Sequence, residues 1–129
     1  MNEIVDQFVA ADKYIFVTPF WNFGLPPMMK AYIDAVSVVG KTFKYTENGS
    51  VGLLAGKPAV HIQARGGFYS EGPAAAAEHG DSYLQTVFAF YGLEAQPSII
   101  IEGVAVLRDQ VDSLKESAIM KAREAALAF

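Results

Sequence analysis

The segment Phe20 to Phe23 holds the residues of this chain best suited to bind a ligand: three aromatic rings around one amide side chain. It follows a predicted strand, Tyr14 to Val17, and precedes a helix opened by Pro26 and Pro27. A strand that ends in a loop and a helix amino terminus is where open α/β sheets bind ligands. Aromatic rings beside an amide suit a flat, partly polar ring system better than a bare phosphate. Core packing explains most aromatic residues, but four consecutive residues after a proline cannot all face one core.

A second candidate is Arg65-Gly66-Gly67, which follows the predicted strand Pro58 to Ala64. Two glycines let a backbone approach a ligand closely and point successive N–H groups at it. A flexible connecting loop is the alternative reading of these glycines. Because both candidate loops follow strands of one predicted parallel sheet, we expect them at the same edge of that sheet.

Other kinds of site have little support in the sequence. Gly40-Lys41-Thr42 resembles the end of a P-loop, but Ala35 stands where the first glycine belongs, so we interpret Gly40 as a helix C-cap. There are no cysteines, and neither His61 nor His79 has a partner at ligand spacing, so we expect no metal site and a structural or surface role for both histidines.

No side chain is expected to act as a catalytic nucleophile, acid or base. The sequence contains no G-x-S-x-G segment around its serines, which argues against a hydrolase triad. Its acidic residues show no useful pairing, and we interpret Glu71, Glu78 and Asp81 as part of a loop or of a solvated helix face.

The composition indicates one globular domain over residues 1–129. Hydrophobic residues make up 52% of the 129 residues and charged residues 19%, and the net charge is −4. The ten cations are scattered, which argues against a nucleic-acid partner. No apolar run approaches the about 20 residues of a membrane span, and the acidic start is unlike a secretory signal, so we expect a cytoplasmic protein without a membrane partner.

The hydrophobic pattern predicts alternating strands and helices. Helices are predicted at 2–11, from Pro26 to Gly40, from Ala74 to Tyr91 with Gly92 closing it, and at 110–128; strands at 14–17, 58–64 and 98–101; and an extended segment at 42–46 before an Asn48-Gly49 turn. This alternation is typical of an α/β fold with a parallel sheet and helices on both faces. The nearly continuous apolar strand 14–17 is expected to be buried on both faces.

Several strings together resemble a known family, the FMN-dependent NADH azoreductases, also called NADH:quinone oxidoreductases. They are PFWNF, then GKTFKYTENG starting at Gly40, then ARGG starting at Ala64 and YSEGP starting at Tyr69. The resemblance extends through almost the whole chain. It implies a flavodoxin-like three-layer sandwich that forms homodimers with active sites at the dimer interface.

The resemblance also implies roles for individual residues. The isoalloxazine ring of FMN would be held by Phe20, Trp21, Asn22 and Phe23, and its pyrimidine edge would be bonded through the backbone of Ala64, Arg65, Gly66 and Gly67. Many family members have Ser at the position of Ala64, so here any contact must come from the main chain. Tyr45 and Phe90 match positions that wall the substrate pocket. NADH or NADPH would reduce the flavin at N5, and the flavin would then reduce a quinone or an azo compound.

The resemblance begins only at the helix before the third strand of the family's fold, whose strand order is 2-1-3-4-5. The first two strands and the loop that receives the FMN phosphate have no counterpart, so the domain is expected to be incomplete at its N-terminus. Strand 14–17 would then have an unpaired, aggregation-prone edge. Two other readings stay open: a truncated or degenerate chain that dimerises but binds no FMN by itself, and a flavodoxin-like electron carrier, which the mild charge disfavours.

Overall fold

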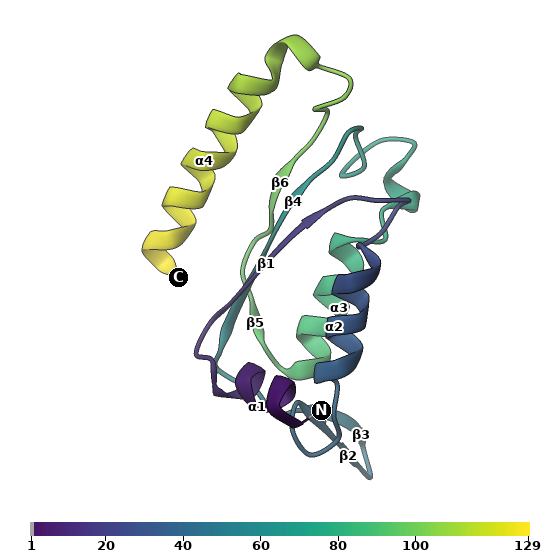
Figure 1. Ribbon diagram of the computed structural model, residues 1–129, viewed down its shortest axis with the longest axis vertical. Helices are drawn as coiled ribbons and strands as arrows, with labels where there is room; N and C mark the ends of the chain where they lie inside the picture. Colours follow the sequence, from purple (N-terminus) through teal and green to yellow (C-terminus); the bar gives the residue numbers. More distant parts are fainter. Residues whose placement is uncertain (1) are drawn as a thin grey trace.

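A parallel sheet with helices on both faces forms the centre of the protein in a computed structural model that describes residues 2–129 (Figure 1). The elements are α1 (Asn2–Ala10), β1 (Tyr14–Pro19), α2 (Pro27–Val36), β2 (Phe43–Thr46), β3 (Gly49–Gly52), β4 (Pro58–Ala64), α3 (Asp81–Tyr91), β5 (Glu94–Ala95), β6 (Ile99–Ile101) and α4 (Val111–Ala128). Strand β4 is central, with β1 on one edge and β5 and β6 in line on the other. The predicted α/β class is confirmed.

The two faces of the sheet are covered unequally. On one face, α1, α2 and α3 enclose a core in which Phe16 packs against Phe88 and Phe8 against Tyr14, with ring centroids 5.3 and 4.4 Å apart. On the other face, α4 alone packs over β4 and β6 through a small cluster around Val60, Ile99 and Ala118. Figure 1 shows α4 standing apart from the helices of the opposite face.

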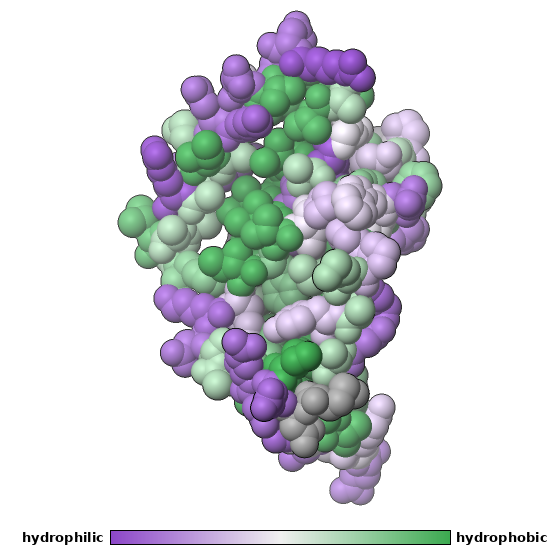
Figure 2. Space-filling view, viewed as in Figure 1, coloured by the Kyte–Doolittle hydropathy of each residue, from purple (hydrophilic) through white to green (hydrophobic). Residues whose placement is uncertain are grey.

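The expectation that strand 14–17 is buried on both faces is wrong. Buried and exposed residues alternate along β1, and Ile15 and Val17 are 60% and 65% exposed. The reason is that α4 lies over β4 and β6, while no element within residues 2–129 covers this side of β1. Figure 2 shows apolar side chains gathered between α4 and β1. Within the same residues, β1 also has no strand partner on its outer edge.

Helix α2 begins as the sequence predicts and ends earlier. Pro26 is its N-cap and Pro27 its first residue, where a missing N–H costs little. The helix stops at Val36, and the amide and hydroxyl of Ser37 both donate to the carbonyl of Ile33. Gly40, with φ +85°, lies in the following turn, so its interpretation as the C-cap is wrong.

Helix α3 starts seven residues later than the predicted Ala74. The carboxylate of Glu78 accepts hydrogen bonds from the amides of Gly80, Asp81 and Ser82 at 2.7, 2.6 and 3.0 Å, which caps the helix at this point. Residues Ala75–Ala77 form one 3₁₀ turn instead. Gly92 closes α3 in the left-handed conformation, as predicted.

The β2–β3 hairpin packs against the end of α3. A Cβ added at Gly52 would lie 2.1 Å from backbone atoms of both Tyr91 and Gly92, so only glycine fits there. Figure 1 shows the hairpin at the end of the sheet opposite the loops that follow β1 and β4. The short strand β5 was not predicted; its two residues extend the ladder on β4 beyond β6.

Candidate functional site

The aromatic loop after β1 is a tight and strained turn. The amides of Trp21 and Gly24 each donate to the other's carbonyl, at 3.1 and 3.0 Å. Between them, Asn22 and Phe23 have φ of +49° and +68°, as at the two central positions of a type I′ turn. A bulky residue seldom adopts positive φ, and such strain concentrates at functional sites. The turn leaves Trp21 57% and Phe23 51% exposed, so two of its rings face solvent.

Phe20 joins this turn to the second candidate loop. Its ring lies 4.6 Å from the ring of Tyr69 between centroids, and the guanidinium carbon of Arg65 lies 5.2 Å from its centroid. Phe23 also contacts Tyr69, edge to face at 6.3 Å. The structure therefore brings the two predicted loops together at the carboxyl ends of β1 and β4.

The backbone of the loop after β4 is bonded on one side only. The carbonyls of Arg65, Gly66 and Gly67 accept hydrogen bonds from the amides of Val104, Ala105 and Gly103, at distances of 3.3, 3.1 and 3.1 Å in that order. No acceptor within residues 2–129 pairs with the amides of Gly66 and Gly67. The loop therefore carries neighbouring N–H groups that are available to a ligand.

The side chain of Arg65 points into the protein and is only 2% exposed. Its guanidinium forms ion pairs with Glu78 and Glu102, both at 3.2 Å, and donates from Nε to Gln63 at 3.0 Å. Glu102 in turn accepts hydrogen bonds from the amides of Tyr69 and Ser70. What this loop can offer a ligand is consequently its backbone.

Glu78 lies in a loop, as one of the two predicted readings has it, but Asp81 does not lie on a solvated helix face, because both carboxylates are bonded within this network. Asp81 accepts hydrogen bonds from His61 Nδ1 at 2.8 Å and Ser98 Oγ at 2.6 Å. Burial raises the pKa of Asp81, but the hydrogen bonds from His61, Ser98 and Gln85 outweigh it, and the net pKa is lowered. Asp81 is therefore ionised at neutral pH.

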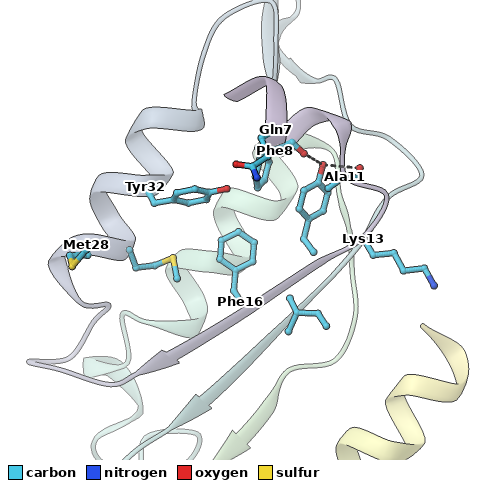
Figure 3. A pocket seen from close by; sticks show the side chains of 10 residues that line it. Gln7, Phe8, Ala11, Lys13, Phe16, Met28 and Tyr32 are labelled. Carbon is cyan, nitrogen blue, oxygen red and sulfur yellow. Dashed lines mark hydrogen bonds between the residues drawn. The ribbon is translucent and has the colours of Figure 1, made fainter. Parts of the chain in front are cut away.

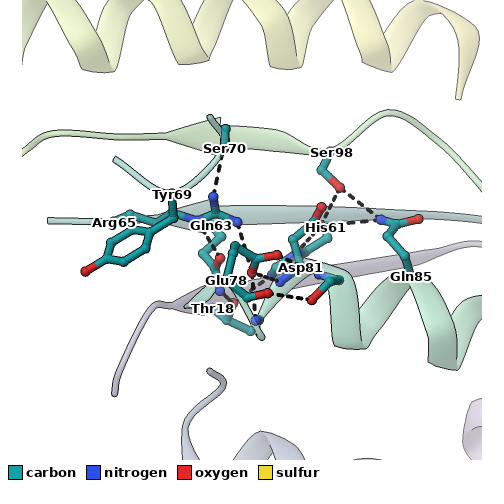
Figure 4. Close-up of polar contacts among 12 residues, drawn as sticks. Thr18, His61, Gln63, Arg65, Tyr69, Ser70, Glu78, Asp81, Gln85 and Ser98 are labelled. Atoms are coloured by element: carbon teal, nitrogen blue, oxygen red, sulfur yellow. Dashed lines mark hydrogen bonds and ion pairs between the residues drawn. The ribbon is translucent and has the colours of Figure 1, made fainter. Parts of the chain in front are cut away.

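Thr18, His61 and Asp81 have the connectivity of a hydroxyl–imidazole–carboxylate triad. Thr18 Oγ1 lies 2.7 Å from His61 Nε2 (Figure 4). However, Thr18 is 3% exposed and His61 fully buried, so no substrate reaches the hydroxyl. The arrangement is structural, in agreement with the role expected for His61. Among residues 2–129 no group of three or more His, Asp or Glu side chains is placed to hold a metal ion.

A separate hollow of about 520 Å³ lies away from these loops, between α1, β1 and α2 (Figure 3). Apolar side chains line most of it, among them Phe8, Phe16 and Met28, and Lys13 stands at one side. It runs beside the unpaired edge of β1. The hollow lies on the face of β1 that α1 and α2 cover, and it shares no lining residue with the two loops.

Comparison with known proteins decides the family. A family model described as a flavodoxin-like fold matches residues 1–127. The chain belongs to this flavodoxin-like family. Two curated relatives of this flavodoxin-like chain are the FMN-dependent NADH:quinone oxidoreductase of Geobacillus kaustophilus, 55% identical, and the FMN-dependent NADH:quinone oxidoreductase 2 of Bacillus subtilis, 54% identical.

Solved structures give the same result. The azoreductase AzrA is 38% identical with a TM-score of 0.94, over 99% of this flavodoxin-like chain and 62% of the other chain. An FMN-dependent NADH-azoreductase from Bacillus anthracis, solved in complex with FMN, is 36% identical with a TM-score of 0.78, over 94% and 61% of the two chains. In the two curated relatives the match covers all 129 residues but only 61% of the relative. The flavodoxin-like chain thus spans about three fifths of their length.

Two predicted site residues of the flavodoxin-like chain lie apart from the others. Tyr45, on β2, and Phe90, near the end of α3, both pack against Phe43, with centroids 5.4 and 4.3 Å from its ring. This cluster belongs to the hairpin end of the sheet, opposite the Trp21 turn and the Arg65 loop (Figure 1). One copy of the chain does not bring the two groups together. Ala64, by contrast, ends β4 beside Pro19 of β1, next to both loops.

Proposed function

We propose that this chain binds the ring of FMN between the Trp21 turn and the Arg65 loop, as part of an oxidoreductase that transfers reducing equivalents from NADH or NADPH to quinones or azo compounds. One observation carries the proposal. The turn after β1 carries exposed aromatic rings, and the loop after β4 carries backbone amides without a partner in residues 2–129. The contact between Phe20 and Tyr69 holds these two segments next to each other. A flat ring with a polar edge can stack on the aromatic side chains and accept hydrogen bonds from the amides. The names of the relatives support FMN and NADH.

The residues divide the work between packing and hydrogen bonding. Trp21 and Phe23 present apolar faces on which a planar ring can stack, and the Asn22 side chain adds a donor and an acceptor. The amides of Gly66 and Gly67 donate to the polar edge of the ring. Ala64 has no hydroxyl, so its contribution is limited to the backbone. When bound, FMN supplies the hydride and electron-transfer chemistry.

The same backbone donors determine which charge the site can stabilise. Backbone N–H groups fixed by the bonds from Val104 and Ala105 stabilise negative charge that develops at the ring edge, without reorganising. No side-chain acid or base is needed for this role. The Arg65 guanidinium is already neutralised by Glu78 and Glu102, so its main task is to hold the loop.

We also propose that the protein acts as a homodimer in the cytoplasm, where nicotinamide cofactors are available, and that residues 1–129 fold as one domain. The position of Tyr45 and Phe90 supports the dimer. Because both lie at the hairpin end of the sheet, they can wall a pocket only if a second copy brings them to the Trp21 turn.

The alternative is a flavodoxin-like chain that dimerises but does not bind FMN by itself. The exposed side of β1 and the match to only 61% of the relatives favour it. The visible absorption of the purified chain, with and without added FMN, separates the two. A retained flavin with a perturbed spectrum supports the enzyme. The absence of binding at FMN concentrations far above micromolar would leave the alternative.

A further inference from the structure

A buried series of hydrogen bonds runs from Arg65, in the second loop of the proposed site, to Asp81 at the start of α3 (Figure 4). Starting from Arg65, it passes to Gln63 at 3.0 Å, to Thr18 at 2.9 Å, to His61 at 2.7 Å and to Asp81 at 2.8 Å. Its three middle members, Thr18, His61 and Gln63, are at most 3% exposed. Every buried side-chain polar atom in residues 2–129 has a hydrogen-bond partner, so no member of this hydrogen-bonded series is left unsatisfied.

The two ends fix the direction of every bond between them. A guanidinium only donates, so Arg65 Nε–H donates to Gln63 Oε1, and the amide nitrogen of Gln63 faces Thr18. The carboxylate of Asp81 only accepts, so His61 carries its hydrogen on Nδ1.

Nε2 of His61 is then an acceptor, and the hydroxyl of Thr18 donates to it while accepting from Gln63. Donation runs one way, from Arg65 to Asp81. If His61 carried a hydrogen on Nε2, the Thr18 oxygen would receive two donors, and its own hydrogen would have no acceptor within residues 2–129.

The chain is attached to both loops. At one end, Arg65 opens the glycine loop, and Glu102, paired with Arg65, binds the amides of Tyr69 and Ser70. In the middle, Gln63 also donates to the carbonyl of Pro19, the residue before Phe20. One set of side chains therefore fixes the spacing between the aromatic turn and the amide-bearing loop.

We propose that Thr18, His61 and Gln63 are positioning residues that hold the two loops at the separation needed for the ring of a flavin. The link between these residues and FMN rests on the proposed function. The direction of the hydrogen bonds and their attachment to the two loops do not depend on it. A network that merely stabilised the fold would contribute to unfolding free energy without affecting the loops in particular.

Thr18→Val and Thr18→Ser are the test pair. Val keeps the shape but leaves Gln63 and His61 without their partner, whereas Ser keeps the hydroxyl. Thr42→Val is the matched control, because the buried Thr42 hydroxyl donates to the carbonyl of Val36 at 2.8 Å, near the hairpin end of the sheet. We expect Thr18→Val to weaken FMN binding by about tenfold, and Thr18→Ser and Thr42→Val by less than about twofold.

Two measurements without flavin keep the proposal independent of FMN. Nitrogen-15 NMR of the wild-type chain is expected to show the Nδ1–H tautomer of His61. Amide hydrogen exchange is expected to be faster at the hydrogen-bonded amides of Trp21, Gly24, Tyr69 and Ser70 in Thr18→Val, and unchanged there in Thr42→Val. An Nε2–H tautomer, or equal exchange in both Val variants, would overturn the proposal. If the wild-type protein binds no FMN but both flavin-free results are as expected, the proposed function is wrong. The role of Thr18, His61 and Gln63 in positioning the two loops is then still supported.

If Thr18→Val does not fold, Gln63→Met removes the hydrogen bonds that Gln63 makes with Thr18 and Arg65. We expect this variant to show the same faster amide exchange in the two loops. If Gln63→Met folds with unchanged exchange in both loops, the proposal is wrong. The tautomer of His61 needs no variant and decides the direction of the chain in either case.

Discussion

The guanidinium of Arg65 lies over the ring of Phe20, with Cζ 5.2 Å from the ring centroid. Phe20 follows β1 and Arg65 follows β4, so this contact joins segments that are separated by 45 residues. Because Arg65 is buried and its charge is balanced by Glu78 and Glu102, the contact is part of a desolvated cluster. Neither loop of the proposed site is positioned by its own sequence alone.

Replacing Arg65 with Met is expected to destabilise the fold by about 3 kcal/mol, because two largely buried carboxylates lose their cation. Urea unfolding at neutral pH measures this. The control is Lys30→Met, which removes the exposed i,i+4 pair with Asp34 and is expected to cost far less. Equal losses in the two variants would show that the burial of the Arg65 pairs carries no energetic weight.

Trp21→Ala is expected to weaken FMN binding by about 1–3 kcal/mol, by analogy with base–aromatic stacking, while the unfolding free energy changes by about 0.5 kcal/mol or less. The difference arises because the ring is 57% exposed and contributes little to the core. Flavin titration and urea unfolding on the same sample give both numbers. Met28→Ala, at a residue 86% exposed, serves as the control. An unchanged affinity would remove Trp21 from the site.

Phe23→Gly is expected to cost the fold less than Phe68→Gly does, because glycine adopts φ +68° without strain and this relief offsets the other losses. The same variant should bind FMN more weakly, since a ring is lost from the turn. Phe68→Gly is the control: Phe68 is also exposed but has no positive φ, so the glycine there should destabilise. If both variants destabilise equally, the Phe23 backbone is not strained in solution.

Asp81 makes stability depend on pH in the acid range. Its pKa is lowered in the folded state, so its contribution is present above the usual Asp pKa and is lost as the pH falls through the folded value. Asp81→Asn is therefore expected to be less stable than wild type at pH 7 and to lose less stability on acidification. Urea unfolding from pH 7 down to about pH 3 tests this against the usual Asp pKa of about 3.9. Parallel pH curves for the two proteins would contradict it.

The sequence predicted the alternation of elements and the two loops because these depend on local patterns. PAVHIQA matches β4 in full, and Gly92 ends α3 where expected. The errors arose where a particular side-chain contact decides, whether that contact is local or distant. The start of α3 depends on Glu78 capping Gly80, Asp81 and Ser82, and the exposure of β1 depends on where α4 packs.

The buried chain of polar residues could not be found by spacing alone. Thr18 and Gln63 lie opposite each other only in the parallel register of β1 and β4, and Asp81 reaches His61 from the start of α3. The one available signal was polar residues at alternate positions, His61 and Gln63 in a strand otherwise apolar and Arg65 directly after it. In a central strand such residues all face one side and need partners there.

The single partner of β1 has a consequence for how the molecule opens. Within residues 2–129, β4 is bonded along both edges, whereas β1 is held on one edge and covered on one face. Local opening begins where fewer contacts must break, so the amides of β1 are expected to exchange with solvent sooner than those of β4. The aromatic turn is thus carried by an edge strand of the sheet, and the amide loop by the central strand.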